Sequence, residues 1–83
     1  MTKFEELMII TMEECGELIQ ACSKMCRNRN EKHTQELIKE IGDVSCMIEL
    51  LQEYDLVTQK NILEGMRNKR NKLKKWSNLI SHD

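Results

Sequence analysis

The chain has 83 residues, of which 40% are hydrophobic, and its 13 lysines and arginines are balanced by 14 aspartates and glutamates. This length is enough for a single domain, residues 1–83, and a formal net charge of −1 argues against a nucleic-acid-binding protein with a uniformly basic surface. Because the chain contains no proline and only three glycines, its composition favours an all-α fold.

The sequence shows no sign of a membrane or secretory segment. Its N-terminus carries Lys3, Glu5 and Glu6 and lacks the apolar core of a secretory signal. No apolar run approaches the roughly 20 residues that a membrane-spanning helix requires. We therefore expect a cytoplasmic protein that has no membrane partner.

The first predicted helix runs from about Lys3 to Cys26. Apolar residues recur along it at heptad-like intervals, namely at Phe4, Leu7, Met8, Cys15, Leu18, Cys22 and Met25. Its three cysteines are expected to be reduced and buried as small hydrophobic side chains. A zinc site formed by Cys22, Cys26 and His33 is a less favoured alternative, because this spacing matches no standard ligand pattern.

The second predicted helix begins at about Glu31 or Thr34 and ends at Glu53. The polar run of residues 27–30 separates it from the first helix, and either Asn30 or Thr34 can cap it. Its apolar stripe consists of Leu37, Ile41, Val44, Ile48 and Leu51.

The third predicted helix runs from about Val57 to Leu79 and is strongly basic. One side of it carries Ile62, Leu63, Met66, Leu73, Trp76 and Ile80. Between residues 60 and 75 it has seven basic residues and one acid, and Lys69 lies among the apolar side chains. Such a lysine can extend its charged end to water, or it can bind a phosphate or an acidic site.

These elements predict an antiparallel helix bundle of three main helices. A chain this short buries little apolar surface, and three helices leave an apolar face uncovered. We therefore expect the bundle to be completed by homo-oligomerisation, as a homodimer or a dimer of dimers.

Two acidic pairs, Glu14 with Glu17 and Glu40 with Asp43, are the most informative feature of the chain. Each has i,i+3 spacing, which places both carboxylates on one helix face with Cβ atoms roughly 5–6 Å apart. A single such pair is usually a solvated surface, but antiparallel packing of the two helices would bring both pairs together. Four neighbouring carboxylates repel one another, and a hard divalent cation relieves that repulsion.

Two glycines lie beside these acids. Gly16 and Gly42 each immediately precede the second acid of a pair, although glycine inside a helix costs about 1 kcal/mol relative to alanine. We interpret their positions as a sign that another helix approaches closely there.

Around these residues the chain resembles the MazG-like nucleoside triphosphate pyrophosphohydrolases of the all-α NTP pyrophosphatase superfamily. Residues 13–21 resemble the first metal-binding helix of the family, residues 36–44 the second, and residues 66–73 the basic third helix. Glu36 departs from the pattern, because some members carry a basic residue there.

The resemblance implies a Mg²⁺-dependent hydrolase that cleaves a ribo- or deoxyribonucleoside triphosphate between the α and β phosphates, giving a monophosphate and pyrophosphate. It implies that the metal ligands and catalytic residues are Glu14, Glu17, Glu40 and Asp43. Mn²⁺ is an alternative metal. Lys69 and Lys72 take the positions of substrate-binding residues in this resemblance.

A helical-bundle nucleic-acid-binding or adaptor protein is the alternative reading of the same sequence. It would use the basic third helix for phosphate contacts or for docking to a partner. Nucleic acid is the less favoured ligand, because the acidic residues elsewhere in the chain would repel its backbone.

Overall fold

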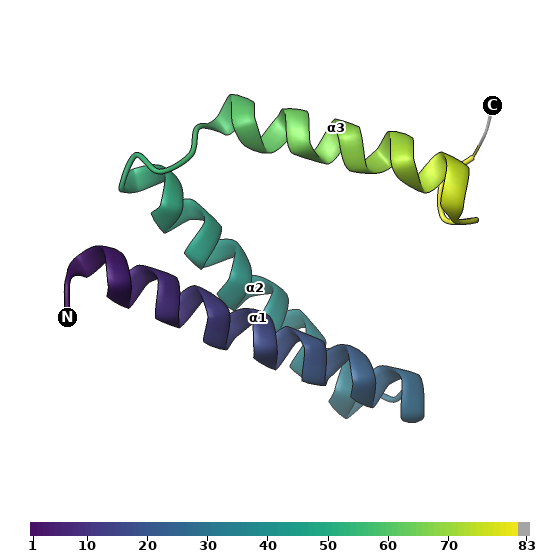
Figure 1. Ribbon diagram of the computed structural model, residues 1–83. Helices are drawn as coiled ribbons and strands as arrows, with labels where there is room; N and C mark the ends of the chain where they lie inside the picture. The colour runs from purple at the N-terminus through teal and green to yellow at the C-terminus, as the bar shows by residue number, and fades with distance from the viewer. Residues whose placement is uncertain (82–83) are drawn as a thin grey trace.

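The computed structural model describes residues 1–81 and consists of three helices joined by short connections (Figure 1). Helix α1 spans Lys3–Arg27, α2 spans Glu31–Glu53, and α3 spans Gln59–Trp76. The described residues contain no strand, which confirms the all-α prediction. No helix in this part of the chain is long and apolar enough to cross a membrane.

Capping boxes start two of the helices. The Thr2 hydroxyl accepts a hydrogen bond from the Glu5 backbone N–H at 3.1 Å, and the Glu5 carboxylate accepts one from the Thr2 N–H at 3.0 Å. Thr58 and Asn61 repeat this exchange at the start of α3. Each box supplies acceptors for backbone N–H groups that a helix start would otherwise leave unpaired.

The third helix is shorter than the sequence predicted. It begins at Gln59 rather than Val57, because Thr58 is its extended N-cap. It ends at Trp76 rather than Leu79, because Ser77 has extended backbone angles (φ −143°, ψ 168°) and leaves the helix.

Asn30 is the cap of α2. Its side-chain oxygen accepts a hydrogen bond from the His33 backbone N–H at 2.8 Å. The Thr34 hydroxyl instead donates to the Asn30 carbonyl oxygen at 2.8 Å and so lies inside the first turn. Of the two caps that the sequence allowed, the structure has the earlier one.

We expect Asn30→Ala to lower the free energy of unfolding by about 1 kcal/mol, because the His33 N–H loses its acceptor. Urea unfolding followed by circular dichroism measures this loss. Asn28→Ala is the matched control, since the Asn28 side chain makes no hydrogen bond among the described residues, and it should leave the unfolding midpoint unchanged. Equal effects of the two substitutions would contradict the capping role.

The closest packing in the molecule joins α1 and α2, which form an antiparallel hairpin (Figure 1). Leu7, Ala21 and Met47 lie at its centre, with exposed fractions of 6%, 4% and 7%. Helix α3 turns back from the end of α2 through residues 54–58, where Asp55 has φ 60°, and makes scarcely any contact with the other helices among the described residues. Completion of the bundle by a second copy stays a prediction.

Several residues of the predicted apolar stripes lie outside the hairpin core. Ile41 and Ile48 of α2 are exposed. The expectation that the cysteines are buried is wrong, since Cys15, Cys22, Cys26 and Cys46 are all free and exposed. Both α1 and α2 carry apolar residues outside the face that they share, and the sequence analysis assigned residues of both faces to one stripe.

The alternative zinc site is not assembled. Among residues 1–81, Cys22, Cys26 and His33 do not gather into a group that could hold a metal ion. His33 Nδ1 instead lies 2.6 Å from the Asn28 carbonyl oxygen, at the turn between α1 and α2. The histidine therefore contributes to the turn.

The two mid-helix glycines do not mark a close helix approach within this chain. A Cβ added at Gly16 or Gly42 would meet no other atom within 4 Å. Both positions face open space, so the packing of α1 against α2 does not require glycine there.

Candidate metal centre

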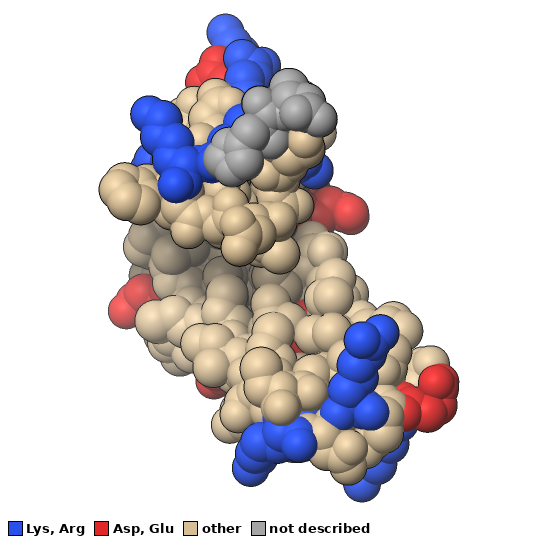
Figure 2. Space-filling model, turned by 90° about the vertical axis from the view of Figure 1, so that its right-hand side faces the viewer, with Lys and Arg blue, Asp and Glu red and all other residues tan. Residues whose placement is uncertain are grey.

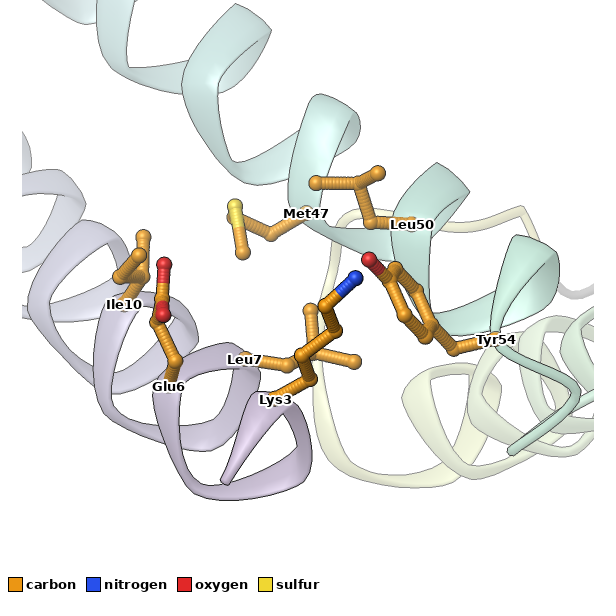
Figure 3. A pocket seen from close by; sticks show the side chains of 7 residues that line it. All are labelled: Lys3, Glu6, Leu7, Ile10, Met47, Leu50 and Tyr54. Carbon is orange, nitrogen blue, oxygen red and sulfur yellow. The ribbon is translucent and has the colours of Figure 1, made fainter. Parts of the chain in front are cut away.

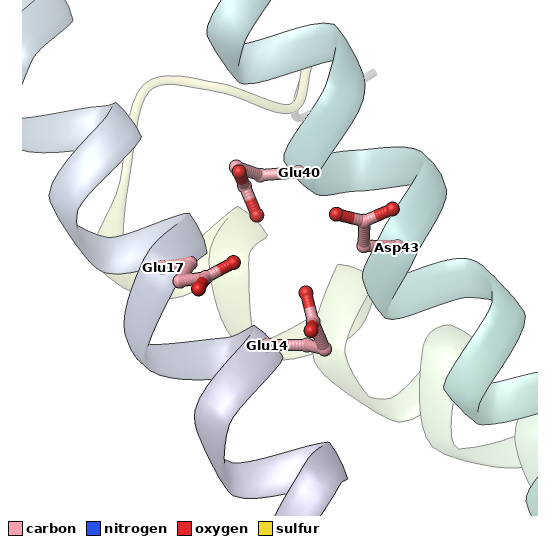
Figure 4. Close-up of side chains that lie close together, drawn as sticks. All are labelled: Glu14, Glu17, Glu40 and Asp43. Atoms are coloured by element: carbon pink, nitrogen blue, oxygen red, sulfur yellow. The ribbon is translucent and has the colours of Figure 1, made fainter.

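The hairpin brings the two acidic pairs together, as the sequence predicted. Glu14 and Glu17 come from the middle of α1, and Glu40 and Asp43 come from the facing turns of α2. Each residue offers one carboxylate oxygen, and these four oxygens lie within 4.8 Å of one another. Figure 4 shows the four side chains directed into the space between the helices.

Two oxygens of this cluster are shielded from water without a partner. Glu14 Oε2 and Glu40 Oε2 are inaccessible to solvent and accept no hydrogen bond within the described chain. A shielded carboxylate oxygen without a partner destabilises the folded protein, because no hydrogen bond or ion pair replaces the hydration that it has lost. The two atoms come from opposite helices, so a cation placed among the four carboxylates would compensate both. This donor set therefore fits a hard divalent ion.

The surroundings of Glu14 disfavour its ionised form. Burial raises the pKa of the Glu14 carboxyl above its usual value, and the negative charges of Glu17, Asp43 and Glu40 raise it further. Without a cation, the ionised Glu14 therefore opposes folding. The folded protein is more stable when the Glu14 carboxyl is protonated, and this stability is lost as the pH rises through the raised pKa of that carboxyl.

Lys39 is a member of the site that the sequence reading missed. Its Nζ lies 2.7 Å from Asp43 Oδ2 and 3.3 Å from Glu40 Oε1. The hydrogen bond to Asp43, followed by that to Glu40, raises the pKa of the Lys39 ammonium. The i,i+4 spacing of Lys39 and Asp43 is the sequence signal that could have identified it. This ammonium neutralises part of the α2 pair and leaves the shielded oxygen of Glu14 without a partner.

The two predicted substrate lysines form no ion pair with the four carboxylates among residues 1–81. Lys69 and Lys72 are exposed on α3 and make no hydrogen bond or ion pair in the part of the chain that the structure describes. The four acids are thus assembled by the hairpin alone, and the role of the lysines stays a prediction.

A pocket of about 170 Å³ opens between the N-terminal turns of α1 and the C-terminal turns of α2 (Figure 3). Its walls are mainly apolar, and its lining consists of Lys3, Glu6, Leu7, Ile10, Met47, Leu50 and Tyr54. Ile10 precedes Glu14 by four residues, and Met47 follows Asp43 by four, so the pocket begins about one helical turn from the acids. The sequence reading named none of these residues as a ligand site.

Comparison with protein-family models finds a match to the MazG nucleotide pyrophosphohydrolase domain over residues 2–76. The match includes α1, α2 and α3 and all four clustered carboxylates. Comparison with curated proteins and with solved structures gives no match.

Proposed function

Because the chain belongs to the MazG nucleotide pyrophosphohydrolase family, we propose that it hydrolyses nucleoside triphosphates between the α and β phosphates with the help of Mg²⁺. The products would be a ribo- or deoxyribonucleoside monophosphate and pyrophosphate. The observation that supports this proposal best is the convergence of four carboxylates, two of which hold a shielded oxygen without a partner.

In this proposal Glu14, Glu17, Glu40 and Asp43 hold the metal ion. Mg²⁺ is the first candidate, because it prefers oxygen ligands and retains some of its water, and Mn²⁺ is an alternative. When bound, such an ion neutralises phosphate charge and makes water a better nucleophile.

The carboxylates also supply the base. Attack by water forms a bond from the water oxygen to phosphorus, breaks the bond to the bridging oxygen, and releases one proton. Glu17 is the exposed member of the cluster, so its carboxylate can accept that proton and return it to bulk water. The other three are half-buried between the helices, where packing keeps their positions constant.

The remaining groups would position the substrate. Lys69 and Lys72 would bind phosphate oxygens as charge partners. The apolar pocket between Leu7, Ile10, Met47 and Leu50 begins about one helical turn from the acids and offers a surface on which a flat nucleobase could pack. Tyr54, at the edge of this pocket, carries a hydroxyl that can bond to a base or a sugar.

A panel of the eight common ribo- and deoxyribonucleoside triphosphates tests the proposed reaction. Purified protein with Mg²⁺ should release pyrophosphate and the matching monophosphate from at least one of them, and a chelator should stop the release. Absence of pyrophosphate from the entire panel, with Mg²⁺ and with Mn²⁺, would overturn the proposal.

We expect Lys39→Gln to tighten the binding of Mg²⁺ or Mn²⁺ by roughly three- to tenfold, because the substitution removes a positive charge that contacts Asp43 and Glu40. Isothermal titration calorimetry of the nucleotide-free protein measures this change. Lys39→Arg keeps the charge and should bind the ion about as the parent does. An unchanged affinity in Lys39→Gln would show that the ammonium does not compete with the ion.

The exposed, basic α3 favours a second candidate function, a helical nucleic-acid-binding or adaptor protein. Its seven basic residues could contact a phosphate backbone. Binding of this kind would weaken steeply with salt, so a gel-shift assay across salt concentrations distinguishes it from nucleotide hydrolysis.

A further inference from the structure

Lys39 lies on the water side of the candidate metal centre. Its Nζ is 3.3 Å from Glu40 Oε1, whereas the other oxygen of that carboxylate, Oε2, is shielded from solvent. The Lys39 side chain is 65% exposed, and that of its second partner, Asp43, is 38% exposed. The ammonium therefore meets the cluster on the side from which a ligand dissolved in water arrives.

The contacts of Lys39 allow it to change partner. Ion pairs at exposed positions contribute little to stability, because water screens them and the long side chains lose conformational freedom. The lysine ammonium is carried on a flexible stem of four carbons, and its charge has no preferred direction. Lys39 can therefore exchange one anionic partner for another without a movement of the α2 backbone.

The cluster stays negative even when a divalent ion is bound. Its four carboxylates carry four negative charges when ionised, and an ion of charge +2 cancels only two of them. A chain of phosphates is itself strongly negative, so the cluster repels it unless further cations lie close by. The site therefore needs a positive side chain near the position of the phosphates.

The cations other than Lys39 are placed differently. On the face shown in Figure 2, lysine and arginine gather on α3 and at the end of the hairpin where α1 joins α2. Lys24 is paired with Glu36, and Lys69 and Lys72 form no ion pair with the cluster among residues 1–81. Within this part of the chain, Lys39 is the cation in contact with the candidate metal ligands.

We propose that Lys39 is a substrate-binding residue that exchanges the cluster for a phosphate. In the metal-free protein its ammonium neutralises Glu40 and Asp43, and in the loaded site it turns to a phosphate oxygen of the substrate. A divalent ion competes with the ammonium for these carboxylates and repels it, whereas a phosphate attracts both cations. This role rests on the proposed function, because it needs an ion in the cluster and a phosphate beside it.

Lys39→Gln should have opposite effects on the binding of the ion and of the phosphate. It should tighten the binding of Mg²⁺ to the nucleotide-free protein by roughly three- to tenfold. It should weaken the binding of pyrophosphate to the Mg²⁺-saturated protein by about tenfold. Isothermal titration calorimetry measures both, with pyrophosphate as the probe because the proposed reaction does not consume it. Lys39→Arg keeps the charge and should bind both ligands within about threefold of the parent.

Lys32→Gln is the matched control, because it removes the same charge from the same helix. Lys32 is exposed, forms no ion pair among residues 1–81, and precedes Lys39 by about two helical turns. The substitution should change either affinity by less than about twofold at physiological salt. Pyrophosphate binding that Lys32→Gln weakens as much as Lys39→Gln would reduce the effect to net charge and overturn the proposal.

Two further results would also overturn the role of Lys39. Unchanged pyrophosphate binding in Lys39→Gln, or no binding by the parent, would show that its ammonium does not hold phosphate. Weaker binding of both ligands would show that Lys39 only keeps the carboxylates in place.

The binding measurements are independent of hydrolysis. Opposite effects in Lys39→Gln, without pyrophosphate release from any nucleotide, would support the phosphate contact and reject the proposed reaction. Release of pyrophosphate by a protein in which Lys39→Gln binds pyrophosphate normally would reject the role of Lys39 alone.

Discussion

Pyrophosphate release should fall by about a hundredfold or more in Glu17→Gln and in Asp43→Asn, with either variant as well folded as the parent. Each substitution replaces one carboxylate of the cluster by an amide of the same shape, one from α1 and one from α2. The amide is a weaker ligand for a hard cation, and it cannot accept the proton from water. Initial rates with the best nucleotide of the panel, at saturating Mg²⁺, measure the loss.

Two acids outside the cluster provide matched controls. Glu13 on α1 and Glu49 on α2 are exposed and do not belong to the group of converging carboxylates. Glu13→Gln and Glu49→Gln remove the same charge from the same helices. Full activity in both would show that the loss of activity in Glu17→Gln and Asp43→Asn is due to their place in the cluster. Circular dichroism should show equal helical content in all four variants. Parental activity in Glu17→Gln or Asp43→Asn would refute the assignment of the site.

The four carboxylates could be predicted from the sequence because two simple regularities coincide in them. The i,i+3 spacing places each pair on one helix face, and a short connection makes the two helices antiparallel. Asn30 caps α2 only three residues after α1 ends at Arg27, and this short turn sets the register in which Glu14 and Glu17 meet Glu40 and Asp43. Local rules therefore determine most of this site.

Lys39 and the apolar pocket were missed for different reasons. The Lys39–Asp43 pair follows the ordinary i,i+4 rule, but such pairs are common on solvated helices and did not stand out in the sequence. The pocket has no comparable pattern, because Leu7 and Ile10 meet Met47 and Leu50 only through the crossing of α1 and α2. Its lining follows from tertiary packing, which spacing along the chain does not encode.

The exposed apolar residues explain why the predicted core was partly wrong. Leu7 and Ala21 face α2, whereas Cys15, Cys22 and Ile19 lie on another side of α1 that none of residues 1–81 covers. Hydrophobic periodicity indicates which side chains are buried in a folded protein. It does not indicate whether the surface that buries them belongs to the same chain or to another. When a helix has apolar residues both on the face packed in the chain and on an exposed face, the two sets overlap in the sequence pattern and cannot be separated there.

Stability measurements should show that Glu14→Gln stabilises the metal-free protein and abolishes its response to metal. In the parent, saturation with Mg²⁺ or Mn²⁺ at about a hundred times the dissociation constant should raise the melting temperature by roughly 10–20 °C. In Glu14→Gln the melting temperature without metal should already be higher. The amide carries no charge into a shielded position beside three other carboxylates.

The pH dependence gives this prediction a definite sign. Burial raises the pKa of Glu14, so at low pH the parent holds a neutral carboxyl there and should be about as stable as Glu14→Gln. As the pH rises through the raised pKa, the parent loses stability relative to the variant. Differential scanning calorimetry with a chelator, from about pH 4 to pH 8, should therefore show the two melting curves separating toward neutral pH.

Glu36→Gln is the matched control, because its pH dependence should have the opposite sign. Glu36 accepts a hydrogen bond from Lys24 at 3.1 Å, and this bond lowers the pKa of its carboxyl. The hydrogen bond stabilises the folded protein above the ordinary pKa of a carboxyl, and this stabilisation is lost as the pH falls through the lowered pKa of Glu36. Glu36→Gln should therefore be slightly less stable than the parent at neutral pH, approach it in acid, and keep the full response to metal. If the stability of Glu14→Gln relative to the parent showed the same pH dependence as that of Glu36→Gln, the shielded carboxylates would behave as ordinary surface acids. That result would contradict the placement of a cation among them.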